Sequence, residues 1–139
     1  MPDGEAVNAE TAAAAGGVSV LVGALLPWWV YGPGLHAFSF WASELEVAVR
    51  VVEVVFGALL LAAARKKVPG GPLVLGIFAF LIALSEPFFE IVACIDGCVI
   101  RPFIGWYLTI IGGVLAAVGG FASVWVWVTS RRTEHARIL

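Results

Sequence analysis

Four long apolar runs constrain the fold of this chain more than any other feature of its sequence. A helix needs about 20 residues to cross a hydrocarbon core about 30 Å thick, and each run has roughly that length. The runs cover residues 11–30, 45–64, 72–95 and 104–128. The connections between them are short, which favours antiparallel neighbours in space. The sequence therefore predicts an all-α membrane protein, an antiparallel four-transmembrane-helix bundle over residues 11–128.

The composition agrees with a membrane protein and excludes other classes. Hydrophobic residues make up 61% of the 139 residues, charged residues make up 13%, and the mean hydropathy is +1.00. An average soluble domain has roughly 45–50% apolar and about 25% charged residues. The net charge of −2 and the short basic clusters provide no surface for nucleic acid. We expect the lipid bilayer to be a partner.

The chain carries no group of residues typical of an enzyme. It has no nucleophile beside a general base, no phosphate-binding glycine loop and no zinc motif. His36 and His135 fall on opposite sides of the predicted membrane, so they cannot ligate one haem together. We therefore expect no cofactor and no metal, and an enzyme ranks last among the function classes.

Basic residues set the predicted orientation. Arg65, Lys66 and Lys67 lie between the second and third runs, and Arg131, Arg132 and Arg137 follow the fourth. Positive residues that flank short loops stay in the cytoplasm. Both termini are thus predicted to be cytoplasmic, with residues 1–10 as an acidic tail and residues 129–139 as a basic tail.

Small residues form two rows on the fourth predicted helix. One row is Gly105, Thr109, Gly113 and Ala117, and the other is Gly112, Ala116 and Gly120. Small residues let membrane helices approach closely, because lipid tails leave van der Waals contact as the main attraction between helices. The rows predict packing of the first helix, which carries the weaker pair Ser19 and Gly23, on the fourth. Two rows are more than one neighbour needs, so a docking face for another subunit is the alternative.

Charged residues lie inside the second and third runs. Glu46, Arg50 and Glu53 share one face of the second predicted helix, and Glu86 and Glu90 share one face of the third. At about 1.5 Å per residue, Arg50 and Glu86 both lie about 21 Å from the inner turn. An ionised side chain that faces lipid costs roughly 2.5–3.5 kcal/mol. We predict a hairpin in which Arg50 bridges Glu86, with Glu53 as a second acceptor.

The acidic side chains of this intramembrane cluster outnumber its one arginine. Either some of the glutamates are protonated, or a cation is held there, or a partner supplies positive charge. Glu46 has a simpler interpretation, because Ser43 followed by Glu46 matches a capping box at a helix start. Glu90 lies close enough to the outer surface to be solvated. A proton or cation site on Glu53 and Glu86 is therefore the alternative to a structural bridge.

Cys94 and Cys98 flank an Asp-Gly turn in the loop before the fourth run. This loop is predicted to lie on the oxidising side of the membrane, which favours a disulfide between the two cysteines. A redox-active pair is the alternative. Four-span thiol oxidases that use quinone have two cysteine pairs in their outer loops, whereas this chain has one pair with a different spacing.

Two segments carry a resemblance to a known group of proteins. "LLPWW" closes the first run and "GWYLTIIGG" opens the fourth. With the short outer loop and the basic inner turn, the chain resembles small, largely uncharacterised four-span membrane proteins of high-GC actinobacteria, from Ala15 to about Arg132. The resemblance implies a bacterial plasma membrane and carries over no site residues. "VRVVEVV", "SEPFFE" and the cysteine pair depart from the pattern.

These features lead to two hypotheses about function. The first is an accessory, assembly or stabilising subunit of a larger membrane complex, bound to other integral membrane subunits or to copies of itself. The alternative is a small oligomeric transporter or channel that couples to protons or cations through its intramembrane carboxylates.

Overall fold

The computed structural model describes residues 2–26, 28–31, 36–37, 44–68, 70–93, 100–102 and 104–139. The helices are α1 (Pro2–Leu25), α2 (Glu44–Arg65), α3 (Gly71–Ala93) and α4 (Ile104–Ile138). The strands are β1 (Trp29–Tyr31), β2 (His36–Ala37) and β3 (Ile100–Pro102). The predicted four-helix bundle is confirmed, and the short strands are an addition that the sequence did not predict.

The first and last helices extend into the predicted tails. α1 begins at Pro2 rather than at residue 11 and ends at Leu25 rather than at residue 30. α4 continues to Ile138 instead of ending at residue 128. Apolar content set the predicted bounds, whereas helices also include polar residues of good helix propensity such as glutamate and arginine. The predicted bounds of α2 and α3 lie within two residues of the observed ones.

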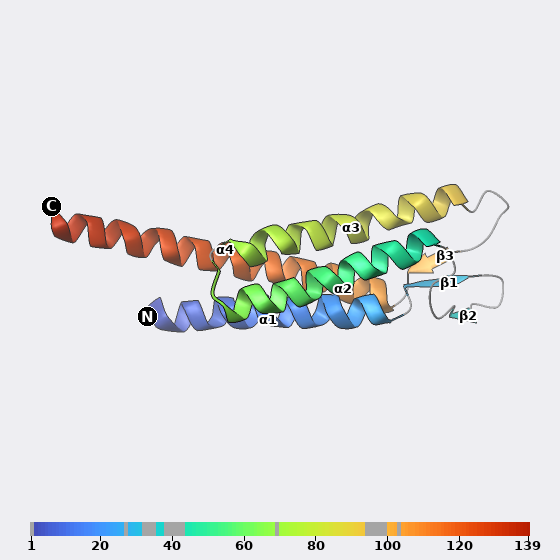
Figure 1. Cartoon of the computed structure of the whole chain (residues 1–139), viewed down its shortest axis with the longest axis horizontal. Helices are drawn as coiled ribbons and strands as arrows, with labels where there is room; N and C mark the ends of the chain where they lie inside the picture. Colours follow the sequence, from blue (N-terminus) through green and yellow to red (C-terminus); the bar gives the residue numbers. More distant parts are fainter. Residues whose placement is uncertain are drawn as a thin grey trace.

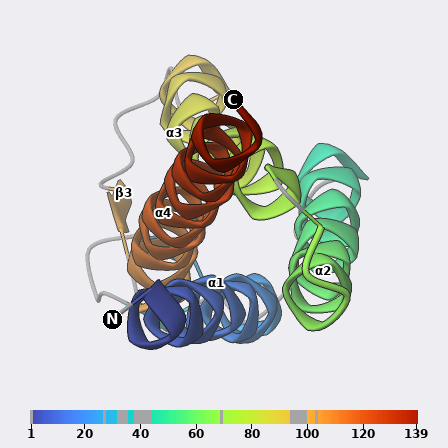
Figure 2. The same cartoon turned by 90° about the vertical axis from the view of Figure 1, so that its left-hand side faces the viewer.

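The helices form a ring in which consecutive helices are neighbours. α1 packs on α2 and α4, α3 packs on α4, and the interface between α2 and α3 is the least extensive of the four. Both termini and the turn between α2 and α3 lie at one end of the bundle, here called the terminal end (Figure 1). The strands lie at the opposite end, the sheet end. Figure 2 views the bundle from the terminal end and shows α4 against both α1 and α3.

The three strands form a small antiparallel sheet in the order β2-β1-β3. Val30 of β1 pairs with Arg101 of β3, and Tyr31 pairs with His36 of β2. The sheet therefore ties the segment after α1 to the segment before α4. Strands of two or three residues are too short to show the alternation by which a sequence reveals a strand.

A buried residue from each helix meets at the centre of the bundle. Val20, Leu60, Ala79 and Ala116 have no exposed surface and form one cluster. The outward faces are apolar instead of polar, as Val55, Val74 and Val118 illustrate, each with at least half of its surface exposed. This is the reverse of a soluble bundle, whose outward faces are charged or polar.

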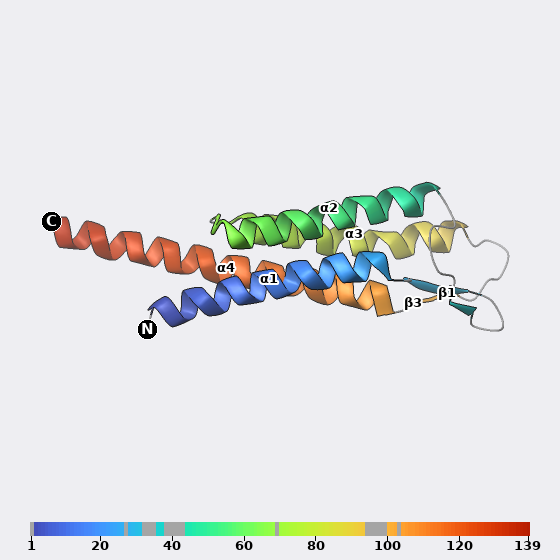
Figure 3. The same ribbon diagram turned by 60° about the horizontal axis from the view of Figure 1, so that its bottom comes forward.

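Among the described residues, three helical stretches are long and apolar enough to cross a membrane: Val7–Leu25, Val47–Arg65 and Ile104–Ile138. α3 contributes a shorter described apolar stretch, Gly71–Ser85. Figure 3 shows α3 lying along the bundle beside α2. The protein thus has the helices of a multi-pass membrane protein.

Candidate functional site

Arg50, in the half of α2 nearer the sheet end, is completely buried. Its Nη1 donates hydrogen bonds to the carbonyl oxygen of Ala24, at 3.1 Å, and to that of Leu26. Both carbonyls lie at the C-terminal end of α1, where helix carbonyls have no amide partner within the helix. A cation at this position also meets the negative end of the helix dipole. Arg50 therefore caps α1 from a neighbouring helix.

The sequence at the end of α1 explains why it needs such a cap. Pro27 follows Leu26, and proline lacks an amide hydrogen and disfavours the helical conformation in the residue before it. The Leu26 amide still donates to the carbonyls of Val22 and Gly23, at 3.1 and 3.2 Å. The last carbonyls therefore need other donors, and Arg50 and Trp28 supply some of them.

Trp28 is the second donor to this helix end. Its side chain is completely buried, and its Nε1 donates to the carbonyl oxygen of Gly23 at 2.9 Å. The Cζ atom of Arg50 lies 5.0 Å from the centroid of the Trp28 ring, within the range of a cation–π interaction. The aromatic ring and the carbonyls together give the buried guanidinium a polar environment.

Two further residues connect this site to α3 and α4. Ala83 of α3 is buried beside Trp28. Trp106 of α4 packs against them and donates from its Nε1 to the carbonyl oxygen of Ala83 at 2.8 Å. We call Trp28, Arg50, Ala83 and Trp106 the Arg50 cluster. It joins all four helices near the sheet end.

Glu53 is a second completely buried charged residue of α2. It follows Arg50 by three residues, so it lies about one turn nearer the terminal end on the same face. Gly57 continues this face, and a Cβ atom placed on it would come within 2.9 Å of the Leu21 amide nitrogen of α1. The face of α2 that carries the predicted charges therefore packs on α1.

The sequence predicts Glu86 as the partner of Arg50, and the structure shows in addition hydrogen bonds from Arg50 to Ala24 and Leu26 at the end of α1. Glu46 lies in α2, and Glu86 and Glu90 lie in α3, but their side chains are outside the described residues. The bridge between Arg50 and Glu86 stays a prediction. Sequence reasoning missed the end of α1 as an acceptor, although Pro27 was a signal that its carbonyls need donors.

One of the two small-residue faces of α4 packs on α1. A Cβ atom on Gly16 would lie 2.5 Å from the Ala116 nitrogen, and one on Gly112 would lie 2.7 Å from the Val20 nitrogen. No side chain fits between backbones at that distance. Ser19 of α1 also donates from its hydroxyl to the Leu108 carbonyl oxygen at 2.8 Å. The face of α4 that contacts α1 includes Gly105, Thr109, Gly112, Ala116 and Gly119.

The other small-residue face of α4 packs on α3. A Cβ atom on Gly76 of α3 would lie 2.6 Å from the Ala117 nitrogen and 2.8 Å from the Gly113 oxygen. One on Gly120 would lie 2.7 Å from the Leu73 Cα atom. Gly113, Ala117 and Gly120 are therefore covered by a helix of the same chain. Intramolecular packing accounts for both rows, so the docking alternative is not needed to explain them.

The terminal end has a different kind of contact between helices. The Lys67 Nζ atom lies 3.6 Å from the Glu10 Oε1 atom, and the two side chains are 74% and 35% exposed. Lys67 has a φ of 55°. The amides of Lys67 and Val68 donate to the carbonyls of Ala64 and Ala63, which is the Schellman pattern of a helix end. A glycine usually occupies the left-handed position of this motif.

Cys94 and Cys98, predicted to form a disulfide, lie outside the described residues. Among the residues that the structure describes, no three histidine, cysteine, aspartate or glutamate side chains are grouped to hold a metal ion. The chemistry of the described site is therefore that of a buried guanidinium, a buried carboxyl group and two indoles.

No family model, curated protein or solved structure matches this chain.

Proposed function

We propose that this chain is a multi-pass protein of a bacterial plasma membrane that acts as an accessory or stabilising subunit of a larger membrane complex. The observation that carries the proposal is the Arg50 cluster. The Arg50 guanidinium lies inside an apolar bundle, where it donates hydrogen bonds to carbonyls at the end of α1 and so joins α2 to α1. This use of charge favours a rigid scaffold over a moving part.

The close packing of the helices supports the same proposal. Backbone atoms of α1 and α4, and of α3 and α4, approach too closely at several glycines to admit even a methyl group. A pathway for ions along either of these interfaces would require the helices to separate. The outward faces, in contrast, are apolar and available to other membrane proteins, as on α2 at Val51, Val55 and Leu59.

The proposed orientation places the terminal end in the cytoplasm. Arg65 ends α2 there, Lys66 and Lys67 follow it, and Arg131 and Arg132 lie near the C-terminal end of α4. Positive residues near the ends of transmembrane helices remain on the cytoplasmic side.

A site-specific photocrosslinker tests the accessory role. We expect crosslinks to one integral membrane protein from exposed positions on a single outward face, for example from Val51, Val55 and Leu59 of α2. Leu60, which is completely buried in the same helix, is the matched control and should give no crosslink. Crosslinks to lipid alone from every outward face would contradict the proposal.

Glu53 favours a second candidate function, coupled transport of protons or cations. A carboxyl group that is completely buried in a membrane helix is a frequent feature of ion pathways. Transport predicts a pH-dependent or cation-dependent flux into liposomes that contain the purified protein. Glu53→Gln should abolish this flux without loss of folding, whereas Glu10→Gln, at the exposed ion pair, should not change it.

A further inference from the structure

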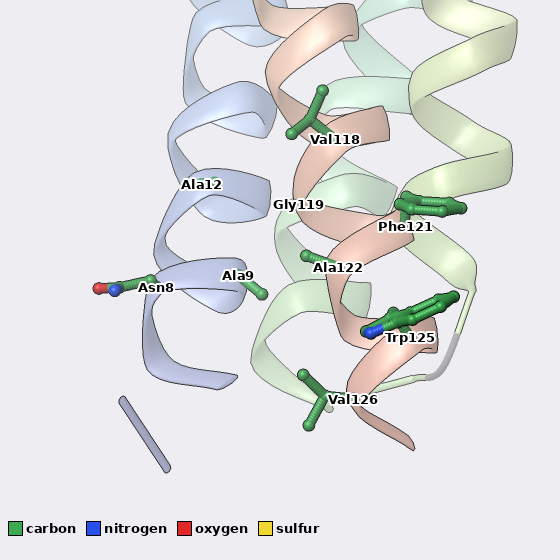
Figure 4. Close-up of a pocket in the computed structure, with 9 residues that line it drawn as sticks. All are labelled: Asn8, Ala9, Ala12, Val118, Gly119, Phe121, Ala122, Trp125 and Val126. Atoms are coloured by element: carbon green, nitrogen blue, oxygen red, sulfur yellow. The ribbon is translucent and has the colours of Figure 1, made fainter. Parts of the chain in front are cut away.

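We infer that a groove between α1 and α4 is a binding site for one anionic phospholipid. The groove lies in the half of the bundle nearer the terminal end and has a volume of about 560 Å³. Figure 4 shows the two helices side by side along it. The inference rests on the proposed placement in a membrane and not on the proposed accessory role.

The lining of the groove fits an acyl chain. Ala9 and Ala12 of α1 form one wall, Gly119 and Ala122 of α4 form the floor, and Phe121 and Trp125 rise beside it. Gly119 allows the two helices to approach closely, because a Cβ atom on it would lie 2.7 Å from the Ala13 nitrogen. Small residues on both helices therefore create a hollow, and larger apolar side chains border it.

The bordering side chains are exposed and turn toward hydrocarbon. Val118, Phe121 and Trp125 have 60%, 58% and 63% of their surface exposed, and the last two rings stack with centroids 6.5 Å apart. Tryptophan is enriched at the boundary between hydrocarbon and headgroups. Trp125 thus marks the level at which the acyl chain ends and the headgroup of the bound lipid begins.

The charge next to the groove selects the class of headgroup. Arg132 follows Trp125 by seven residues, so it lies on the same face of α4, about 10 Å nearer the C-terminus. It is exposed. Arg131 beside it holds its guanidinium 4.6 Å from the Trp127 ring. A phosphate beyond Trp125 would therefore approach Arg132, whereas Arg131 lies on another face of α4, and each basic side chain at a membrane surface attracts anionic lipid.

Quenching of tryptophan fluorescence by brominated lipids tests this inference. The protein is reconstituted into vesicles of phosphatidylcholine with increasing fractions of brominated phosphatidylglycerol, or of brominated phosphatidylcholine. The chain has six tryptophans, so the Trp125 signal is the difference between the protein and its Trp125→Phe variant. We expect Trp125 to select the anionic lipid about fivefold or more over phosphatidylcholine.

Two variants locate the site. Arg132→Gln should remove most of this selectivity, whereas Arg137→Gln, which removes the same charge farther along α4, should retain it. Ala122→Phe fills the floor of the groove and should reduce quenching of Trp125 by both lipids. Circular dichroism and thermal unfolding of each variant confirm that it is folded.

Other outcomes would overturn the inference. Equal quenching of Trp125 by the two brominated lipids would mean that the groove does not recognise a headgroup. An unquenched Trp125 in a protein that sediments as a dimer would mean that a second copy covers the groove. If no tryptophan of the chain is quenched by either lipid, then the membrane placement in the proposed function also fails.

Discussion

Arg50 belongs to α2 and stabilises the bundle by donating hydrogen bonds to carbonyls at the end of α1. Its partners include the carbonyls of Ala24 and Leu26 and the ring of Trp28, which belong to the end of α1 or the residues just after it. In hydrocarbon an unsatisfied carbonyl has no water to bind, so a donor from another helix is worth more than at a soluble helix end. The sequence shows the buried charge but not that the end of α1 accepts hydrogen bonds from it.

Arg50→Met should therefore destabilise the protein. The substitution keeps much of the apolar stem but leaves two buried carbonyls without this donor, and we expect a loss of about 2–4 kcal/mol in the free energy of unfolding. Unfolding by SDS in mixed micelles measures the effect. Arg50→Lys, which retains the charge but not the planar fork of donors, should fall between Arg50→Met and the natural protein.

Arg131 provides a matched control for Arg50. Its guanidinium also lies over a tryptophan ring, that of Trp127, at 4.6 Å. Arg131 is exposed, however, whereas Arg50 is buried against the end of α1. Arg131→Met should change the free energy of unfolding by at most about 0.5 kcal/mol. Equal losses for Arg50→Met and Arg131→Met would show that the carbonyls of α1 do not depend on Arg50.

Lys67 occupies a left-handed position that favours glycine. A residue with a side chain in this conformation costs roughly 1–2 kcal/mol, and an exposed ion pair such as Lys67 with Glu10 returns about 0–1 kcal/mol. Lys67→Gly removes the strain and the ion pair together, whereas Lys67→Ala removes only the ion pair. We expect the glycine variant to be more stable than the alanine variant by about 1 kcal/mol in the same SDS titration. Equal stability would mean that the φ of 55° is not strained.

At the scale of elements, α4 organises the fold, because α1 and α3 pack on its two small-residue faces. The pairing depends on the absence of side chains at a few positions, among them Gly16, Gly76 and Gly112. Between α2 and α3, the described contacts include the rings of Phe56 and Phe78, stacked 6.3 Å apart, and a looser approach at Gly71, where a Cβ atom would lie 3.2 Å from the Ala63 Cβ atom. The interfaces made by glycine should therefore tolerate substitution least.

Gly16→Ala and Gly4→Ala compare the same change at two places in α1. At Gly16 the added Cβ atom would lie 2.5 Å from the Ala116 nitrogen, so α1 and α4 must separate, and we expect a loss of about 1–3 kcal/mol. At Gly4 nothing lies within 4 Å of it, so the better helix propensity of alanine should leave stability unchanged or raise it by at most about 1 kcal/mol. SDS titration of both variants measures the difference, and similar values would contradict the packing of α1 on α4.

The existence of the helices could be predicted from the sequence, because each carries a long apolar run. The end of α4 could not, since residues such as Arg131 and Arg137 continue a helix without continuing its apolar face. The order of neighbours was also predictable from the short connections. The contact of Arg50 with the end of α1 was not, because periodicity assigns Arg50, Glu53 and Gly57 to one face of α2 without saying which helix covers that face.

At the scale of the whole molecule, both termini lie at the same end of the bundle (Figure 1). The proposed orientation places that end in the cytoplasm. A peptide tag on either terminus should then resist protease added to spheroplasts and be cleaved once they are permeabilised. Cleavage of one tag alone in intact spheroplasts would contradict the bundle, and cleavage of both would reverse its orientation.

The polar contacts between helices differ between the two ends of the molecule. At the sheet end, β1 pairs with β3, and the Arg50 cluster joins α2 to α1 and α4 to α3 by hydrogen bonds and brings the four helices together by packing. At the terminal end, the contact described between side chains of opposite charge is a single, largely exposed ion pair of Glu10 and Lys67. The described polar contacts between helices are therefore strongest at the sheet end, whereas the half nearer the termini is held mainly by close backbone packing, as at Gly119 against Ala13.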